Sequence, residues 1–370
     1  MQEFPGKLFG KIMKTSSWVL LIIMVLVIKF ASTQPLWVEE NYSANIYPTI
    51  SKIQRSIFGW IPFSVGDLIY AFLVLIVLIK TFVLIRTIYK KQFTRQYLLS
   101  GLKQIIFFFL LIYVLFYSFW GLNYSRLGIA NQLGLEVKEY SKQDLDTLIT
   151  TLQQRVNFYA HKTDTSKRDS THSSQLLFKK GEEAYLIAAH QFPFLQFSPK
   201  SIKPSMYSSV GHILGFTGYY NPFSGEAQLN TAVPKFLRPF IVTHEIGHQL
   251  GYAKENEANF SGFLVSRSYN DADFRYSMYW EMYFYSVREM FRFDIKQAIC
   301  YRETLDTLVK KDYREWINYL TRKKNFIEPF VSSFYDGYLK ANNQPLGKET
   351  YNQVVAWLVA YYKKYGLESL

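Results

Sequence analysis

The chain has 370 residues, of which 49% are hydrophobic, a formal net charge of +13 and a single cysteine, Cys300. This length allows a membrane section and one large domain with its own core, and one cysteine excludes an intrachain disulfide and a thiolate metal cluster. The sequence contains no Walker loop, dinucleotide fingerprint, zinc-finger spacing or repeat. Because the chain also has segments that could span a membrane, its positive charge points to anionic lipid or an envelope polymer rather than to nucleic acid.

Three apolar stretches near the N-terminus predict membrane-spanning helices. Residues 18–30, 65–85 and 105–122 are almost wholly apolar, and each approaches the length of about 20 residues that a bilayer requires. We expect a membrane domain over residues 1–123, with spans at about 17–37, 64–86 and 103–122. The first is interpreted as an uncleaved anchor, because no small-x-small cleavage site follows Lys29.

Basic residues around these stretches predict the orientation of the chain. Short cytoplasmic segments carry an excess of Lys and Arg, and such residues precede the first span and separate the second from the third: Lys7, Lys11 and Lys14, then Arg86, Lys90, Lys91, Arg95 and Lys103. The N-terminus is therefore expected in the cytoplasm and residues 124–370 outside it. Asp67 and Lys80, near the ends of the second span, are expected to reach water, Lys80 by snorkelling.

The remaining residues predict a mainly helical domain with a small sheet or hairpin. An amphipathic helix is expected over 141–160, capped by Ser141, and another over 181–190, with a polar loop over 163–174. Residues 207–230 change to glycines, aromatics and β-branched residues around the turn at 221–225, which predicts two short strands. From Tyr276 onward the chain is aromatic at helical spacing, which is typical of core or membrane-interface packing.

The segment from His244 to His248 carries the strongest functional signal. On a helix that begins near Pro239 and ends at Gly251, His244 and His248 share one face. They are half of a zinc site, and Glu245 beside them could act as general base on the water that zinc activates. The motif is short, and the alternative is a helix whose histidines pack or hydrogen-bond without a metal.

A catalytic zinc normally has three protein ligands, so a third donor is expected nearby. Glu255 and Glu257 follow, and on a second helix over 253–266 they point to nearly opposite sides, so that only one reaches the metal. We favour Glu255, because its face carries small or polar residues and gives Asn259 a supporting role beside a ligand. Glu257, whose face is more apolar, remains the alternative third ligand.

The hairpin ahead of this helix suggests how a substrate would bind. A strand edge beside the metal helix can hold an extended peptide through main-chain hydrogen bonds. Tyr219 or Tyr220 could then steady the developing oxyanion. The alternative is that these tyrosines fill the core, and His212 is more simply a structural histidine than a substrate contact.

The segments 215–230 and 244–260 resemble a family of bacterial membrane proteins, domain of unknown function 3810. The portion from Glu255 to Asn259 is similar to the E-x-x-A-D helix of zinc peptidases, in which that Glu is the third ligand, although Asn259 replaces the Asp. Gly251 resembles the turn of the metzincins, but Lys254 stands where that group has its third ligand. The resemblance implies an integral protein of the bacterial inner membrane with a periplasmic, zincin-like α+β domain.

Together these patterns predict a membrane-anchored metallopeptidase with Zn²⁺ as cofactor. His244, His248 and Glu255 would bind the ion, Glu245 would move the proton, and envelope proteins or peptides would be the substrates. The competing hypothesis is a non-catalytic envelope scaffold or sensor in which zinc only holds two helices together. The sequence predicts neither the cleavage preference nor the oligomeric state.

Overall fold

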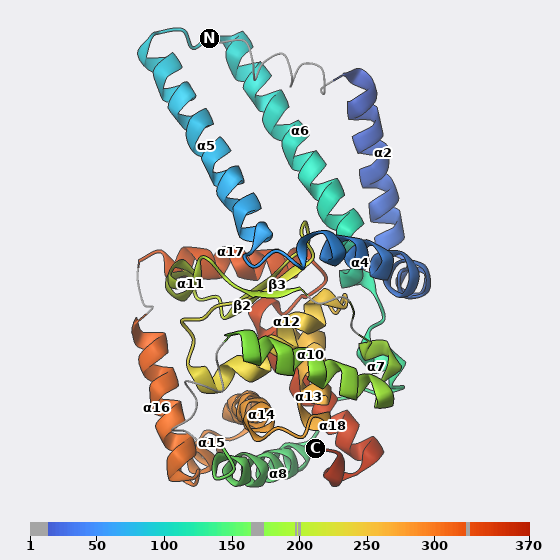
Figure 1. Cartoon of the computed structure of the whole chain (residues 1–370), viewed down its shortest axis with the longest axis vertical. Coiled ribbons are helices and arrows are strands. Elements are labelled where there is room, and N and C mark those ends of the chain that lie inside the picture. The colour runs from blue at the N-terminus through green and yellow to red at the C-terminus, as the bar shows by residue number, and fades with distance from the viewer. Residues whose placement is uncertain (1–13, 164–173, 197, 199–200, 323–325) are drawn as a thin grey trace.

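The computed structural model describes residues 14–163, 174–196, 198, 201–322 and 326–370. The loop predicted over 163–174 lies almost wholly outside these residues. The described chain is mainly helical, and Figure 1 shows a bundle of long helices that projects from one end of a broader body. This arrangement confirms the predicted fold class at the level of a mainly helical protein with a small sheet.

Among the described residues, three helices are long and apolar enough to cross a membrane: α2 (Thr15–Ser32), α5 (Val65–Tyr89) and α6 (Arg95–Phe119). Each of the three stretches predicted to span the membrane thus forms one long apolar helix, with shifted ends. The first ends at Ser32 rather than near 37, because a new helix starts at Pro35. The third begins at Arg95 rather than near 103, because the Thr94 hydroxyl accepts a hydrogen bond from the backbone N–H of Tyr97 and caps it there.

The segment between the first two spans is helical and packs on the rest of the protein. It comprises α3 (Pro35–Trp37), the π-helix η1 (Val38–Ile46) and α4 (Tyr47–Phe58). The Tyr47 hydroxyl donates to the backbone oxygen of Gln249, at 2.7 Å, and Ser51 donates to the same oxygen at 3.3 Å. Residues before position 123 in the sequence therefore pack against residues that follow it.

The body beyond the spans contains most of the helices. In chain order they are η2 (Gly121–Ser125), α7 (Ile129–Gln132), α8 (Lys142–Ala160), α10 (Ser174–Gln191), η3 (Pro193–Leu195), α11 (Ser208–Leu214), η4 (Lys235–Leu237), α12 (Arg238–Gln249), α13 (Glu255–Ser268), α14 (Ala272–Phe293), α15 (Ile295–Glu303), α16 (Thr307–Arg322), α17 (Glu328–Ala341), η5 (Gly347–Gln353), α18 (Val354–Tyr365) and η6 (Leu367–Ser369). The capping box of Ser141 and Asp144 starts α8 as predicted. Helix α10 begins at Ser174, earlier than the predicted 181.

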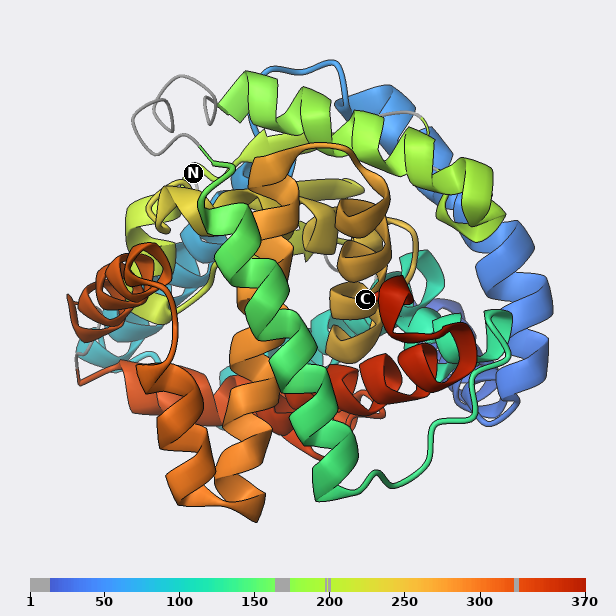
Figure 2. The same ribbon diagram turned by 90° about the horizontal axis from the view of Figure 1, so that it is seen from below.

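The end of the body farthest from the spans is a helical layer. Figure 2 shows α8 and α14 crossing at its centre, and Trp280 and Tyr283 of α14 are almost fully buried. This layer confirms that the aromatic residues after Tyr276 are largely core. Helices α12 and α13 lie between it and the sheet (Figure 1).

The sheet is small and lies on the side of the body nearest the spans. Its strand order is β1-β3-β2, with β1 (Ile202–Pro204) parallel to β3 (Glu226–Leu229) and β2 (Gly218–Asn221) antiparallel to it. The predicted hairpin is confirmed as β2 and β3. The three-residue strand β1 is too short to show a pattern in the sequence, and part of the stretch expected as strand, 208–214, forms α11 instead.

Charged side chains of the sheet region hold the first turn of α5. The Glu226 carboxylate accepts hydrogen bonds from the backbone N–H groups of Val65 (3.2 Å) and Gly66 (2.6 Å), and it pairs with buried Lys203. A carboxylate at a helix N-terminus also interacts favourably with the helix dipole. Asp67, expected to reach water, is instead buried and accepts from the Met206 N–H at 2.7 Å and from the Tyr219 hydroxyl.

Each face of β2 meets a different helix because side chains alternate along a strand. Tyr219 and Asn221 face the start of α5, where Asn221 lies against Gly66. Gly218 faces α12, since a Cβ at this position would overlap the Glu245 carboxylate. The sheet is therefore a layer between a membrane-length helix and the helix that carries the histidines.

Candidate metal centre

Local sequence explains why α12 presents its histidines toward α13. Pro239 lies in the first turn of α12, where it needs no backbone hydrogen-bond donor, and every residue from Pro239 to Gln249 is buried. Gly251 ends the helix with φ of +84°, a conformation that glycine adopts without strain. The chain then turns back, and Glu255 becomes the first residue of α13.

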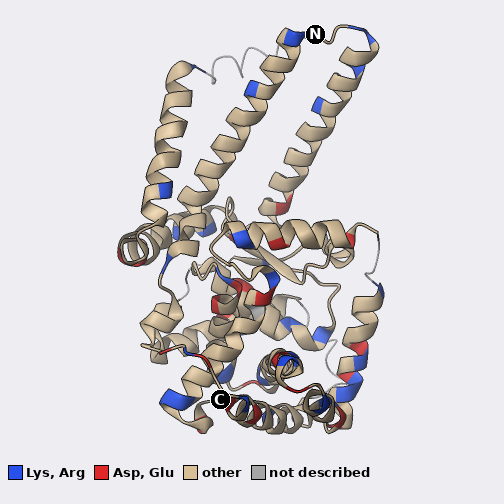
Figure 3. Cartoon of the chain, turned by 180° about the vertical axis from the view of Figure 1, so that it is seen from behind, with Lys and Arg blue, Asp and Glu red and all other residues tan. Residues whose placement is uncertain are grey.

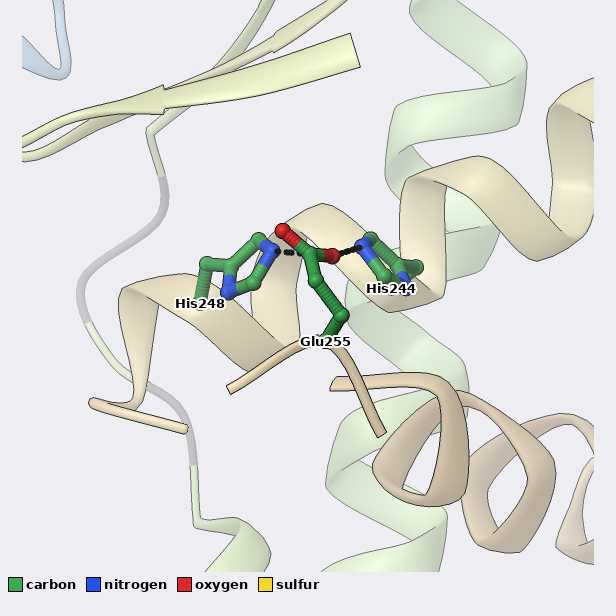
Figure 4. A group of neighbouring side chains, drawn as sticks. All are labelled: His244, His248 and Glu255. Carbon is green, nitrogen blue, oxygen red and sulfur yellow. Dashed lines mark ion pairs between the residues drawn. The ribbon is translucent and has the colours of Figure 1, made fainter. Parts of the chain in front are cut away.

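The side chains of His244, His248 and Glu255 converge on one point (Figure 4). One oxygen of Glu255, Oε2, lies 3.3 Å from Nε2 of His244 and 3.5 Å from Nε2 of His248. The ligand atoms of the three residues lie within 4.8 Å of one another. The structure thus brings together the two histidines and the carboxylate that the sequence favoured.

The other ring nitrogens of both histidines are fixed by hydrogen bonds. Nδ1 of His248 donates to the backbone oxygen of Tyr252 at 2.8 Å, and Nδ1 of His244 lies 2.8 Å from the amide oxygen of Asn259. With the proton on Nδ1, each Nε2 can present a lone pair to a cation, as is usual for metal-ligating histidines. Asn259 therefore lies within hydrogen-bond distance of His244, as the supporting role expected of it requires.

Burial and the charge of the neighbouring side chain act in opposite directions on the pKa values of Glu255 and His248. Burial alone would raise the pKa of Glu255, but the positive charge and hydrogen bonds of the two imidazoles hold it well below its usual value. Burial alone would lower the pKa of His248, but the Glu255 carboxylate raises it to about 9. The two imidazoles therefore favour the anionic form of Glu255, the form that binds a cation, and a cation bound there would replace the proton on Nε2 of His248.

Glu245 has a different environment from Glu255. It is only 3% exposed, and burial raises the pKa of its carboxyl group to about 7, against the opposing effect of the two histidines. Its Oε2 is buried without a hydrogen-bond partner in the described part of the chain. A carboxylate with a pKa near neutrality can both take and return a proton.

The remaining predicted site residues lie away from the three ligand atoms. Glu257 is buried beside Gly128, and its Oε1 is 3.8 Å from the ammonium group of Lys254. The Tyr219 hydroxyl bonds to Asp67 and Ser205, and the Tyr220 hydroxyl is 3.3 Å from that of Tyr47. The His212 ring packs on Tyr319, with ring centroids 4.5 Å apart.

Two aromatic residues that the sequence did not indicate contact the group. The Tyr335 hydroxyl, from α17, donates to Oε1 of Glu255 at 2.7 Å. Trp120, at the end of α6, donates from its indole N–H to the backbone oxygen of His248 at 3.0 Å, and its ring packs against the His248 imidazole. Both are distant from the motif in sequence, and no local pattern distinguishes them from core aromatics.

Comparison with known proteins identifies the family. A family model described as protein of unknown function (DUF3810) matches residues 42–359, which is most of the chain. The chain belongs to the DUF3810 family. No curated protein and no solved structure matches significantly. The DUF3810 match covers α12, α13 and α17, so every residue that lies at the candidate metal centre falls within the family region.

Replacing Asn259 with alanine tests the hydrogen bond that orients His244. We expect zinc affinity to fall by about 10–100-fold, because the ring loses the acceptor for its Nδ1 proton. Asn259→Asp retains an acceptor oxygen and is expected to keep most of the affinity. A competitive zinc titration of both variants measures this, and equal affinity of Asn259→Ala and wild type would contradict a supporting role.

Proposed function

We propose that this protein is a membrane-anchored zinc metallopeptidase that hydrolyses peptide bonds in proteins or peptides of the bacterial envelope. The observation that carries the proposal is the meeting of the His244, His248 and Glu255 ligand atoms, with Glu245 on the same helix turn as His244. Two histidines, a carboxylate ligand and a buried acid form the set that hydrolytic zinc sites use.

The chemistry of the donor set and the two separations from Glu255 fit zinc. Zn²⁺ binds His nitrogen and carboxylate oxygen at about 2.0–2.2 Å, so two donors of a tetrahedral site lie roughly 3.3–3.6 Å apart. The separations from Glu255 Oε2 to the two Nε2 atoms are 3.3 and 3.5 Å. Hard cations such as Mg²⁺ prefer oxygen ligands throughout, which two imidazoles do not supply.

Glu245 would carry the proton in the reaction. When bound, zinc would polarise the peptide carbonyl and lower the pKa of water. Glu245 would take a proton from the attacking water on its unpaired Oε2 and pass it to the leaving amine. Burial of this carboxyl group supports the role, since a desolvated acid returns its proton readily near neutral pH.

The edge strand β2 is the proposed binding surface for the peptide. Asn230 N–H donates to Thr217 O, so residues 217, 219 and 221 direct their backbone groups toward β3. Those of Gly218 and Tyr220 point to the opposite edge, where no described strand pairs with them. An extended substrate that paired with this edge would pass Gly218 and so lie against Glu245.

Orientation in the membrane follows from the charges at the far ends of the spans. Figure 3 shows basic residues gathered at the ends of α5 and α6 that lie away from the body. They include Arg86, Lys90, Lys91 and Arg95. By the positive-inside rule these charges support an orientation with those ends in the cytoplasm and the body, with the candidate centre, in the periplasm.

The alternative is a scaffold or sensor in which zinc only joins α12 to α13. A structural zinc is normally closed by four protein ligands. Within the described residues the group contains three, His244, His248 and Glu255. The three-residue set and the unpaired oxygen of Glu245 favour the catalytic role.

Metal removal tests the proposal. Full-length protein in lipid nanodiscs is expected to contain about one zinc per chain and to cleave members of a peptide library. Treatment with 1,10-phenanthroline should abolish cleavage, and added Zn²⁺ should restore it, because the carbonyl then regains its Lewis acid. Cleavage that persists in metal-free protein would refute the proposal, whereas bound zinc without any cleavage would favour the scaffold.

A further inference from the structure

Helix α17 exposes an apolar stripe. Phe326, just before the helix, and Phe330 and Phe334 within it are 83%, 75% and 79% exposed. Phe330 and Phe334 are four residues apart within α17 and therefore share one face of the helix, and Phe326 precedes its first turn. The stripe continues through exposed Gly337 and Ala341 without a charged residue. This inverts the usual pattern of a helix in water, whose exposed face is polar.

Helix α11 presents a second exposed apolar face beside α17. Met206, just before α11, and Val210 and Ile213 are 55%, 49% and 45% exposed, and the spacing of Val210 and Ile213 places these two on one side of the helix. The two helices are joined through Phe216, whose ring lies 6.0 Å from that of Tyr335. Helices α11 and α17 contact each other, and we call the six exposed residues on and beside them the apolar platform: Met206, Val210, Ile213, Phe326, Phe330 and Phe334.

Hydrogen bonds fix the position of α11 relative to the membrane. The Met206 N–H donates to the Asp67 carboxylate at 2.7 Å, and the Tyr207 hydroxyl donates to the Asp67 backbone oxygen at 2.8 Å. Asp67 lies in the first turn of α5, where that span begins. Trp60, 78% exposed, and Phe63, 46% exposed, precede the same helix, and such aromatics are typical of the membrane–water interface.

The platform therefore lies at the level where the spans enter the bilayer. Figure 1 shows α17 and α11 lying across the end of the body from which α5 and α6 project. We propose that the apolar platform is seated in the bilayer surface, with the phenylalanines of α17 at the boundary between head groups and acyl chains. Helices with one apolar face and a polar opposite face bind lipid in this way.

The opposite face of α17 contacts the candidate metal centre. Tyr335 donates to Glu255 Oε1, and the Tyr335 ring stacks on that of Tyr338 with ring centroids 6.2 Å apart. One helix thus touches lipid on one side and the Glu255 carboxylate on the other. The bilayer surface holds the helix that positions this carboxylate, whatever ligand the carboxylate binds.

Spin labels on the full-length protein test the seating directly. In a Cys300→Ser background, a single nitroxide is attached at Phe330→Cys in one variant and at Phe334→Cys in another, and each protein is placed in vesicles of phosphatidylcholine and phosphatidylglycerol. Both positions are exposed, so the substitutions remove no core packing. Collision rates with oxygen, which concentrates in lipid, are compared with those of a water-soluble nickel chelate.

Matched controls calibrate the two environments. A label at Phe72→Cys, exposed on α5, reports lipid, and one at Lys296→Cys, exposed on α15, reports water. We expect residues 330 and 334 to favour oxygen as position 72 does. Nickel accessibility equal to that at 296 would overturn the proposal, as would low access to both reagents or spin–spin broadening, which would indicate cover by protein or by a second copy. The measurement involves neither metal nor peptide, so it fails independently of the proposed peptidase activity.

Discussion

Replacing Glu245 with glutamine is expected to lower peptide hydrolysis by about 10²–10⁴-fold, the usual contribution of a positioned general base. Zinc content should stay unchanged, because Glu245 contributes no atom to the group of ligand donors. The amide has nearly the same shape as the carboxylate and fits the space that Gly218 leaves beside it. Rates with a cleaved library peptide and zinc content by mass spectrometry measure both quantities in one preparation.

Glu303→Gln is the control for the loss of one negative charge, since Glu303 is exposed on α15. It should hydrolyse the peptide at the wild-type rate. Hydrolysis by Glu245→Gln at that same rate would remove Glu245 from the mechanism and favour the scaffold. Loss of zinc together with activity would instead show that Glu245 supports the structure of the centre.

Glu255→Gln is expected to lose zinc, whereas Glu257→Gln should retain it. Only Glu255 has an oxygen near both imidazoles, while Glu257 faces Gly128 and Lys254. Loss of a supporting hydrogen bond lowers metal affinity by about 10–100-fold. Loss of a ligand should lower zinc affinity by more than this. Glu255 and Glu257 are both buried glutamates on the same helix, so the two variants make the same chemical change in a similar environment.

Zinc per chain, measured after size-exclusion chromatography to retain only folded protein, separates the two variants. The reverse result, with zinc kept by Glu255→Gln and lost from Glu257→Gln, would assign the third ligand to Glu257. Equal zinc in both variants and in wild type would indicate that the metal binds elsewhere on the chain.

Local patterns in the sequence were sufficient to predict which side chains meet in much of the candidate centre. The spacing of His244 and His248 placed both rings on one helical face, and the small or polar neighbours of Glu255 distinguished it from Glu257. Both inferences use residues within one or two helical turns. The structure agrees with these placements because α12 and α13 are joined by a short turn that leaves few alternative packings.

Contacts between distant segments could not be predicted in this way. Tyr335 reaches Glu255 from α17, and Trp120 reaches His248 from the end of α6. Asp67 was expected in water but is buried, because the Met206 backbone N–H, just before α11, and the Tyr219 hydroxyl of β2 donate to its carboxylate. Each contact depends on tertiary packing, for which one sequence contains no periodic signal.

The residues that make these contacts are far apart in the sequence, so the ribosome produces them at different times. Tyr47, Trp120 and Tyr335 touch α12 or α13 from segments that emerge from the ribosome long before or long after them. Translation delivers these parts in order. The finished centre therefore exists only after the last of these segments has been synthesised and has packed against α12 and α13, so a nascent chain carries an incomplete centre until then.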